Sequence, residues 1–205
     1  MLIKTIPVGQ LETNCYIVTD EETLKCAVID PGDEASVILD YVEGSNLTVE
    51  AIFLTHGHHD HWLGLAGVRE GTGAPAYVHK ADSFPHDKRG SHMMFPADED
   101  MKYYAEGDVI KVGNLEFKVL ETPGHSRGSV TLLCESAMFS GDTLFRDSCG
   151  RTDFEGGDMA TILKSLLRLS NLEGDYEVYP GHMASSTLSR ERSFNYYINY
   201  ARNNG

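Results

Sequence analysis

Short apolar runs separated by polar turns dominate the first part of the chain, and this alternation is typical of β-strands. Residues 15–19 and 25–29 are two such runs, and the polar turn DEETL between them predicts a hairpin. The second run stops at Asp30-Pro31-Gly32, a sequence that ends a strand. Further strands are predicted at 48–54, 76–79, 116–121, 130–134, 137–140 and 176–179.

Helices are predicted where apolar residues recur three and four positions apart. One spans about 34–43 with Asp33 as its N-cap, and a shorter one spans about 63–70. A third runs from its N-cap Asp158 to Leu169. The residues expected to face inward are Val37, Ile38, Tyr41 and Val42 in the first helix, and Ile162, Leu163, Leu166 and Leu167 in the third.

Two segments complete the organisation of the chain. The tail from Ser189 is predicted to be helical, and the polar, irregular stretch 83–100 is long enough for a lid or binding loop, with a plain surface excursion as the alternative. No internal repeat or linker is apparent, so we expect a single layered α/β domain over residues 1–205. In the tail, the inward positions are Phe194, Tyr197, Ile198 and Ala201.

Composition and charge narrow the classes of partner. The 205 residues carry 31 acidic and 17 basic side chains, a formal net charge of −14 that disfavours a nucleic-acid partner. No apolar stretch approaches the roughly 18 residues of a membrane span, and the first residues lack a signal-peptide pattern. We therefore expect a cytoplasmic protein with a small-molecule substrate and reduced thiols, its oligomeric state left open. The scattered cysteines are Cys15, Cys26, Cys134 and Cys149.

The nine histidines carry the most chemical information. Four metal donors follow the strand 48–54 within a few residues, namely His56, His58, Asp60 and His61. Two histidines two positions apart lie about 200° apart on an α-helix, so they converge only from a loop at the end of a strand. Packed together without a metal ion, such donors repel when protonated and are costly to bury. A metal site is therefore predicted, with a solvated His/Asp loop as the alternative.

Three more predicted strands end in the same way. The strand 116–121 leads to Thr122-Pro123-Gly124-His125, the strand 137–140 to Gly141-Asp142, and the last strand to Pro180-Gly181-His182. In each case a donor follows a glycine, where the backbone can turn sharply. Four strand ends that each present His or Asp make a shared metal centre a strong prediction.

In this order, THGHHDH, TPGH, GDT and PGH resemble the signature of the metallo-β-lactamase superfamily, and the resemblance covers essentially the whole chain. It implies a four-layer αβ/βα sandwich with a centre of two divalent metal ions between the sheets. By this resemblance one metal is held by His56, His58 and His125, and the other by Asp60, His61 and His182, with Asp142 bridging both. Asp30 is expected to support the metal loop through hydrogen bonds, while His59 points away and Cys149 is buried.

Five imidazoles and two carboxylates suit zinc best, with iron or manganese also possible. Two ions sharing a water would supply a bridging hydroxide that attacks a carbonyl, and Asp60 would both ligate and orient it as the catalytic residue. The run SGDTLFRDSCGRTDFEGGD looks closest to glyoxalase II-like hydrolases, which implies hydrolysis of a small thioester such as a hydroxyacylglutathione. Too few residues follow His182 for the glutathione-binding helical domain of glyoxalase II, so glutathione recognition stays open.

Two alternatives accompany this prediction. Arg151 lies where related thioesterases place a substrate contact, but an ion pair with Asp153 is equally expected. The run Gly150–Phe154 is also shared in style with persulfide dioxygenases, which use a single iron at positions matching His56, His125 and Asp142. A mononuclear iron dioxygenase is therefore the competing function.

Overall fold

The computed structural model describes residues 1–84, 95–96 and 100–204. Its first sheet has the strand order β1-β2-β3-β4-β5-β8, with β1 and β2 antiparallel to their neighbours and the rest parallel. The strands of this sheet are β1 (Leu2–Val8), β2 (Thr13–Asp20), β3 (Lys25–Ile29), β4 (Thr48–Phe53), β5 (Ala76–His79) and β8 (Lys102–Tyr104).

The second sheet has the order β16-β15-β12-β11-β10-β9, and β12 and β15 form its parallel pair. Its strands are β9 (Val109–Val112), β10 (Leu115–Glu121), β11 (Val130–Cys134), β12 (Ala137–Gly141), β15 (Glu177–Pro180) and β16 (Ser186–Thr187). Two short pairs lie outside both sheets, β13 (Leu144–Phe145) with β14 (Ser148–Cys149), and β6 (Ser83–Phe84) with β7 (Phe95–Pro96).

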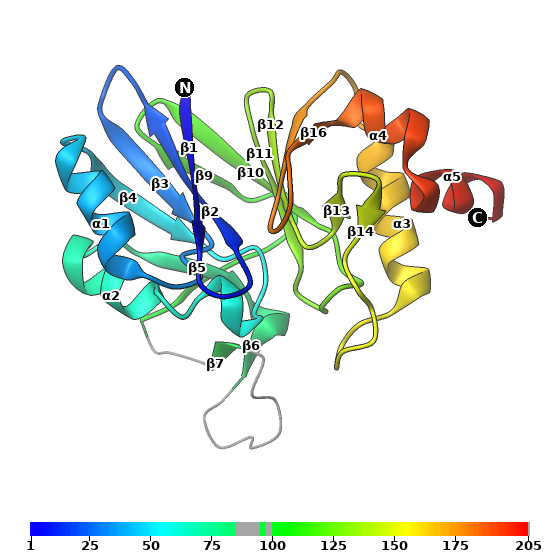
Figure 1. Ribbon diagram of the computed structural model, residues 1–205, viewed down its shortest axis with the longest axis horizontal. Coiled ribbons are helices and arrows are strands. Elements are labelled where there is room, and N and C mark those ends of the chain that lie inside the picture. The colour runs from blue at the N-terminus through cyan, green and yellow to red at the C-terminus, as the bar shows by residue number, and fades with distance from the viewer. Residues whose placement is uncertain (85–94, 97–99, 205) are drawn as a thin grey trace.

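Helices cover the outer faces of the two sheets (Figure 1). On the first sheet lie α1 (Ala35–Gly44) and α2 (Leu65–Thr72), and on the second lie α3 (Met159–Ser170), α4 (Leu188–Phe194) and α5 (Tyr196–Asn204). Short 3-10 turns occur at η1 (His59–His61) and η2 (Lys80–Asp82). The predicted four-layer sandwich is therefore confirmed.

The core follows from the two-residue period of the strands. Ile17 packs toward α1 and α2, whereas Val18 points to the opposite side and packs between the two sheets. In the same inter-sheet layer, Phe53 of β4 meets Phe117 of β10 with ring centroids 5.1 Å apart. A third apolar layer joins the second sheet to α3 and α5. Two sheets held by an apolar layer leave one shared edge at which loops from both can meet.

Several local predictions need correction. Glu34, in the left-handed conformation with φ 46°, is the N-cap of α1, and Asp33 instead accepts a hydrogen bond from the Glu34 backbone N–H. Val37 points to solvent rather than into the core, with 45% of its surface exposed. Asp158 does cap α3, since its Oδ1 accepts from the Thr161 N–H at 2.7 Å.

The predicted C-terminal helix is two helices, because Asn195 interrupts it. This buried side chain donates to the Ser148 carbonyl, and its Oδ1 accepts from the backbone N–H of Tyr197 and Ile198, which begins α5. Phe194 therefore turns outward and is 70% exposed, contrary to prediction, whereas Ile198 is buried as predicted.

The predictions for the stretch 83–100, for membrane spans and for the cysteines can also be compared with the structure. Most of the irregular stretch 83–100 lies outside the described residues. No helix in the described ranges is long and apolar enough to cross a membrane. The four cysteines are free, and Cys149 is half-buried, which raises the pKa of its thiol to about 11. The single-domain organisation and the cytoplasmic location stay predictions.

Candidate metal centre

All the predicted donors follow strand ends that meet at one edge of the sandwich (Figure 1). The loop 55–61 follows β4 of the first sheet, while His125, Asp142 and His182 follow β10, β12 and β15 of the second. These three strands run in the same direction, because β11 is antiparallel to both β10 and β12, and β12 is parallel to β15. Their carboxyl ends therefore lie at the same edge, facing the β4 loop.

The structure brings all seven predicted donors together. Their nitrogen and oxygen atoms form three groups, each within 4.8 Å. His58 Nδ1 lies 2.8 Å from His125 Nε2, and His182 Nε2 lies 3.2 Å from an oxygen of Asp60. The three groups are His56 with His58 and His125, His56 with His61 and Asp142, and Asp60 with His61 and His182.

Asp142 lies close to histidines of both the first and the third of these groups. One of its carboxylate oxygens is 3.5 Å from His61 Nε2, and the other is 3.5 Å from His125 Nε2 and 3.6 Å from His182 Nε2. This is the arrangement expected of a carboxylate that can contact two ions at once.

The chemistry of the donor set fits divalent metal ions. His56 Nε2, His61 Nε2 and Asp142 Oδ1 are buried and have no hydrogen-bond partner among the described residues. Burying such atoms without a partner is costly, and a bound cation removes that cost. Burial first, and then the neighbouring imidazoles, lower the pKa of His56 well below its usual value. Burial and the neighbouring His125 lower the pKa of His58 to about 4, so both rings are neutral at pH 7, the form in which an imidazole can bind a metal ion.

Hydrogen bonds fix which nitrogen each ring turns toward the cluster. The Nδ1 of His61 lies 2.9 Å from Asp30, that of His125 lies 2.7 Å from the Arg151 carbonyl, and that of His182 lies 3.1 Å from the Leu11 carbonyl. Because carbonyl and carboxylate oxygens only accept, each Nδ1 donates, and Nε2 is left for a metal ion.

Asp30 makes the hydrogen bonds expected of it. It is buried, and besides His61 it accepts from the backbone N–H and the hydroxyl of Thr55, each at 2.7 Å. Burial lowers the pKa of His61, but the carboxylates of Asp30, Asp142 and Asp60 outweigh burial and raise it to about 9. These acids therefore favour positive charge at this position, which either a proton or a metal ion supplies.

Asp82 was missed by the sequence analysis. This fully buried carboxylate accepts from Gly57 N–H at 2.9 Å, from the Ser126 hydroxyl at 2.6 Å and from Gly128 N–H at 2.7 Å. One signal could have found it, since Asp82 closely follows β5, and β5 runs parallel to β4 in the same sheet. A carboxylate after β5 therefore arrives at the same edge as the β4 loop.

A cleft of about 560 Å³ opens onto the donor cluster. Asp60, Asp142 and His59 line it, although none of the ligand groups among the described residues includes His59. Its other walls are largely apolar and come from Leu11, Phe145, Cys149, Phe154 and Met183, with Glu12, Ser148 and Arg151 as the polar residues beside the histidines.

Arg151 lines this cleft and also makes the expected ion pair. Its Nε and Nη2 each lie 2.7 Å from an oxygen of Asp153, and its guanidinium stacks 3.9 Å from the centre of the Phe154 ring. Both groups are more than half exposed, so the pair is weak and can exchange for another anion. Two other arginines, Arg127 and Arg146, lie near the site motifs in the sequence, but neither is among the described residues that line the cleft.

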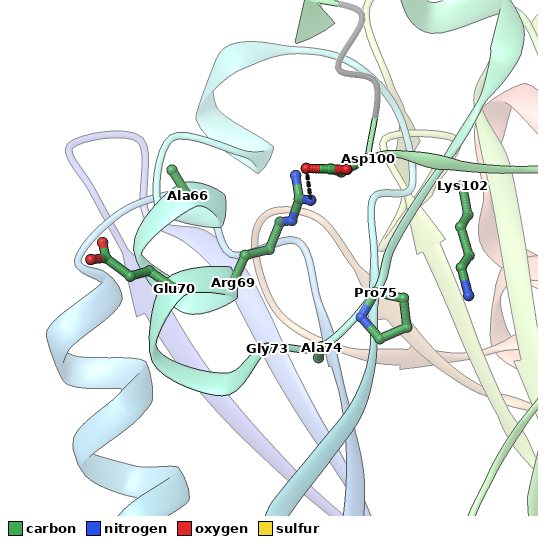
Figure 2. A pocket seen from close by; sticks show the side chains of 8 residues that line it. All are labelled: Ala66, Arg69, Glu70, Gly73, Ala74, Pro75, Asp100 and Lys102. Carbon is green, nitrogen blue, oxygen red and sulfur yellow. Dashed lines mark ion pairs between the residues drawn. The ribbon is translucent and has the colours of Figure 1, made fainter.

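A second hollow lies away from the donor cluster, between α2, the segment 73–75 that precedes β5, and the start of β8 (Figure 2). Arg69 and Asp100 form an ion pair across it at 3.7 Å. Its lining includes none of the predicted site residues, and the donor cluster opens elsewhere. The cleft at the sheet edge is therefore the candidate site.

Sequence comparison places the chain in a family. The model of the metallo-beta-lactamase superfamily matches residues 8–182, and the chain belongs to this superfamily. It is similar to an uncharacterised protein of Aquifex aeolicus, 40% identical over 204 residues that cover 95% of this chain and 96% of the relative. It is also similar to the hydroxyacylglutathione hydrolase GloC of Haemophilus influenzae, 30% identical over 210 residues that cover 97% and 99%.

Comparison with solved structures agrees with membership in this superfamily. The B3 metallo-beta-lactamase BLEG-1 has a TM-score of 0.86 at 30% identity and covers 96% of this chain and 99% of its own. ETHE1 from Myxococcus xanthus scores 0.82 at 28% identity, with coverage of 99% and 91%. TTHA1623, solved in a di-iron-bound form, scores 0.81 at 33% identity, with coverage of 95% and 100%.

Proposed function

We propose that this protein is a hydrolase that uses two divalent metal ions to cleave a small thioester, such as a hydroxyacylglutathione-like substrate. The convergence of seven His and Asp donors on one cleft carries the proposal. His56, His58 and His125 would hold the first ion, Asp60, His61 and His182 the second, and Asp142 would contact both. Nitrogen-rich ligands without thiolate suit zinc, and iron or manganese are the alternatives.

Bound divalent ions lower the pKa of a coordinated water and polarise a carbonyl, which is the chemistry that ester-type hydrolysis requires. Asp60 is the proposed catalytic residue. Burial raises its pKa, but the hydrogen bond from His182 and the charge of His61 hold it well below the usual range. Asp60 therefore stays ionised beside the cleft, where its Oδ atoms would orient the attacking water. A thiol with a pKa of about 8.5 leaves readily as thiolate, so no general acid is needed.

Different walls of the cleft would bind different parts of the substrate. Phe145, Phe154 and Met183 offer apolar surface to the carbon chain of a thioester. Arg151 is the proposed substrate-binding residue, because its guanidinium lines the cleft and can exchange Asp153 for a substrate carboxylate. The name of the Haemophilus relative supports thioester chemistry, and the acidic composition supports a small molecule rather than a nucleic acid.

Metal analysis of the purified protein, combined with two assays, tests the proposal. Two metal ions per chain and hydrolysis of S-lactoylglutathione without oxygen uptake are expected. One iron per chain with oxygen consumption on glutathione persulfide would instead establish the dioxygenase alternative, which needs only the matches to His56, His125 and Asp142. In the hydrolase, Arg151→Ala should raise KM for an anionic thioester more than for a neutral one, with kcat nearly unchanged.

A further inference from the structure

Asp82 lies outside the ligand set, yet its carboxylate joins two loops that come from different sheets. Oδ2 accepts from Gly57 N–H and from the Ser126 hydroxyl, and Oδ1 accepts from Gly128 N–H. Gly57 belongs to the loop after β4, whereas Ser126 and Gly128 belong to the loop after β10. Asp82 itself comes from a third segment, the turn η2 after β5.

These contacts fall beside the donors of the first group. Gly57 separates His56 from His58, and Ser126 directly follows His125. We infer that Asp82 is a positioning residue that sets the spacing of the two loops and so determines the metal affinity of the His56–His58–His125 group. This inference rests on the metal-binding role in the proposed function.

The pocket around Asp82 is built for a carboxylate. The three groups that point at it are two N–H groups and a hydroxyl, and a carboxylate accepts from all of them. An asparagine of the same shape would turn its NH2 group toward at least one N–H donor. Position 128 has no room for a side chain, because a Cβ there would lie 2.7 Å from Asp82 Cγ. The β10 loop thus approaches Asp82 as closely as glycine permits.

The test measures zinc affinity by competition with a chromophoric chelator. It uses the His182→Ala background, which weakens the second group and leaves the first intact. In that background Asp82→Asn should lower zinc affinity about 10-fold, the lower end of the effect of removing a partner hydrogen-bonded to a metal ligand, because Asp82 bonds residues next to the ligands rather than the ligands themselves. Ser126→Ala, which keeps both backbone hydrogen bonds to Asp82, should give a smaller loss in the same direction.

Asp20→Asn is the matched control. Asp20 is also a buried aspartate that accepts from a threonine hydroxyl and from backbone N–H groups. In the register of β2 and β3, Asp20 stands opposite Lys25, the first residue of β3. Asp30 follows the other end of that strand. Its substitution should lower the unfolding midpoint of the metal-free protein without changing zinc affinity.

The outcomes separate the two proposals. If Asp82→Asn and Ser126→Ala both bind zinc within twofold of the parent, the inference is wrong while the proposed function stands. An equal loss of affinity in Asp20→Asn also overturns it, because general destabilisation would then explain the effect. If Asp82→Asn does not fold, as judged by circular dichroism, Ser126→Ala decides alone. A wild-type chain that binds no metal refutes the proposed function itself.

Discussion

Replacing Asp30 by asparagine tests how the second donor group is held. Asp30 accepts from the Thr55 N–H and hydroxyl and from His61 Nδ1. In the neutral His61 ring, this contact keeps the proton on Nδ1 and leaves Nε2 facing Asp60 and Asp142, at 3.6 and 3.5 Å. An asparagine that turns its NH2 group toward His61 makes Nδ1 the acceptor. The proton then moves to Nε2, which can no longer bind a metal ion.

The size of the effect follows from the contacts. Hydrogen bonds to a charged group contribute about 1.5–3 kcal/mol each. Asparagine keeps the bond from the Thr55 N–H through its own oxygen but weakens the other two, so the metal-free protein should lose about 2–4 kcal/mol of unfolding free energy. Loss of the ring orientation should weaken zinc binding about 10- to 100-fold at the Asp60–His61–His182 group. Such a loss corresponds to about 1.4–2.8 kcal/mol of binding free energy.

Two measurements check this prediction. Denaturant unfolding of the metal-free protein gives the stability difference, and stepwise zinc competition gives the affinity of the weaker of two sites. Asp20→Asn again serves as control, since it removes a buried carboxylate of similar hydrogen bonding far along the same sheet. Asp30→Asn that binds two zinc ions with wild-type affinity would refute the tautomer argument, whatever its stability.

Three further predictions concern the same cluster. His182→Ala should remove one of two bound metal ions and leave the circular dichroism spectrum unchanged, because His182 is not part of the core. Gly181→Ala should reduce metal content and turnover together, since a Cβ there would lie 2.2 Å from Asp142 Oδ1. With chelator present, the thermal unfolding midpoint of the metal-free protein should rise as the pH increases from 4 to about 6.5. In this range His58, with a folded pKa of about 4, binds fewer protons in the folded than in the unfolded chain. The midpoint should fall from pH 6.5 to 9, where folded His61, of pKa about 9, binds more.

Each of these has a clear contrary result. Full metal content and turnover in His182→Ala would remove that residue from the proposed ligands. Wild-type metal content in Gly181→Ala would show that the loop yields without cost. A midpoint that keeps rising beyond pH 7 would mean that the carboxylates around His61 do not favour its protonated form.

The strands that deliver the donors could be predicted because they are buried. The segment 137–140 before Asp142 is one example, and the structure buries every residue of β12. The edge strand β1 was missed, since Ile6 and Val8 are its only buried residues and the remaining positions show no clear apolar period. The strand β8 was missed for a similar reason, with Tyr104 as its one buried residue. Edge strands need fewer apolar residues, so the sequence marks them weakly.

In the candidate site too, some residues could be predicted from the sequence and others could not. The donors stand in short motifs at strand ends, which sequence alone reveals. Asp82 stands in no motif, and its partners Gly57 and Gly128 are 25 and 46 residues away. The predicted reason for the glycines was also incomplete. Gly124 and Gly141 do have positive φ, at 133° and 49°, but Gly181 does not, and it is required because Asp142 lies against it.

Asp30 and Asp82 together explain how the histidine-rich loop after β4 is held. In the first sheet β4 lies between β3 and β5, and Asp30 follows β3 while Asp82 ends the turn η2 after β5. The loop is therefore hydrogen-bonded from both sides, with Thr55 donating to Asp30 and Gly57 donating to Asp82. They share no donor and act on different donor groups, so in the double variant the product of the two zinc-binding constants should fall by the product of the two single losses. A combined loss smaller than that product would show instead that the loop between them moves as one body, and that removal of either carboxylate already releases it.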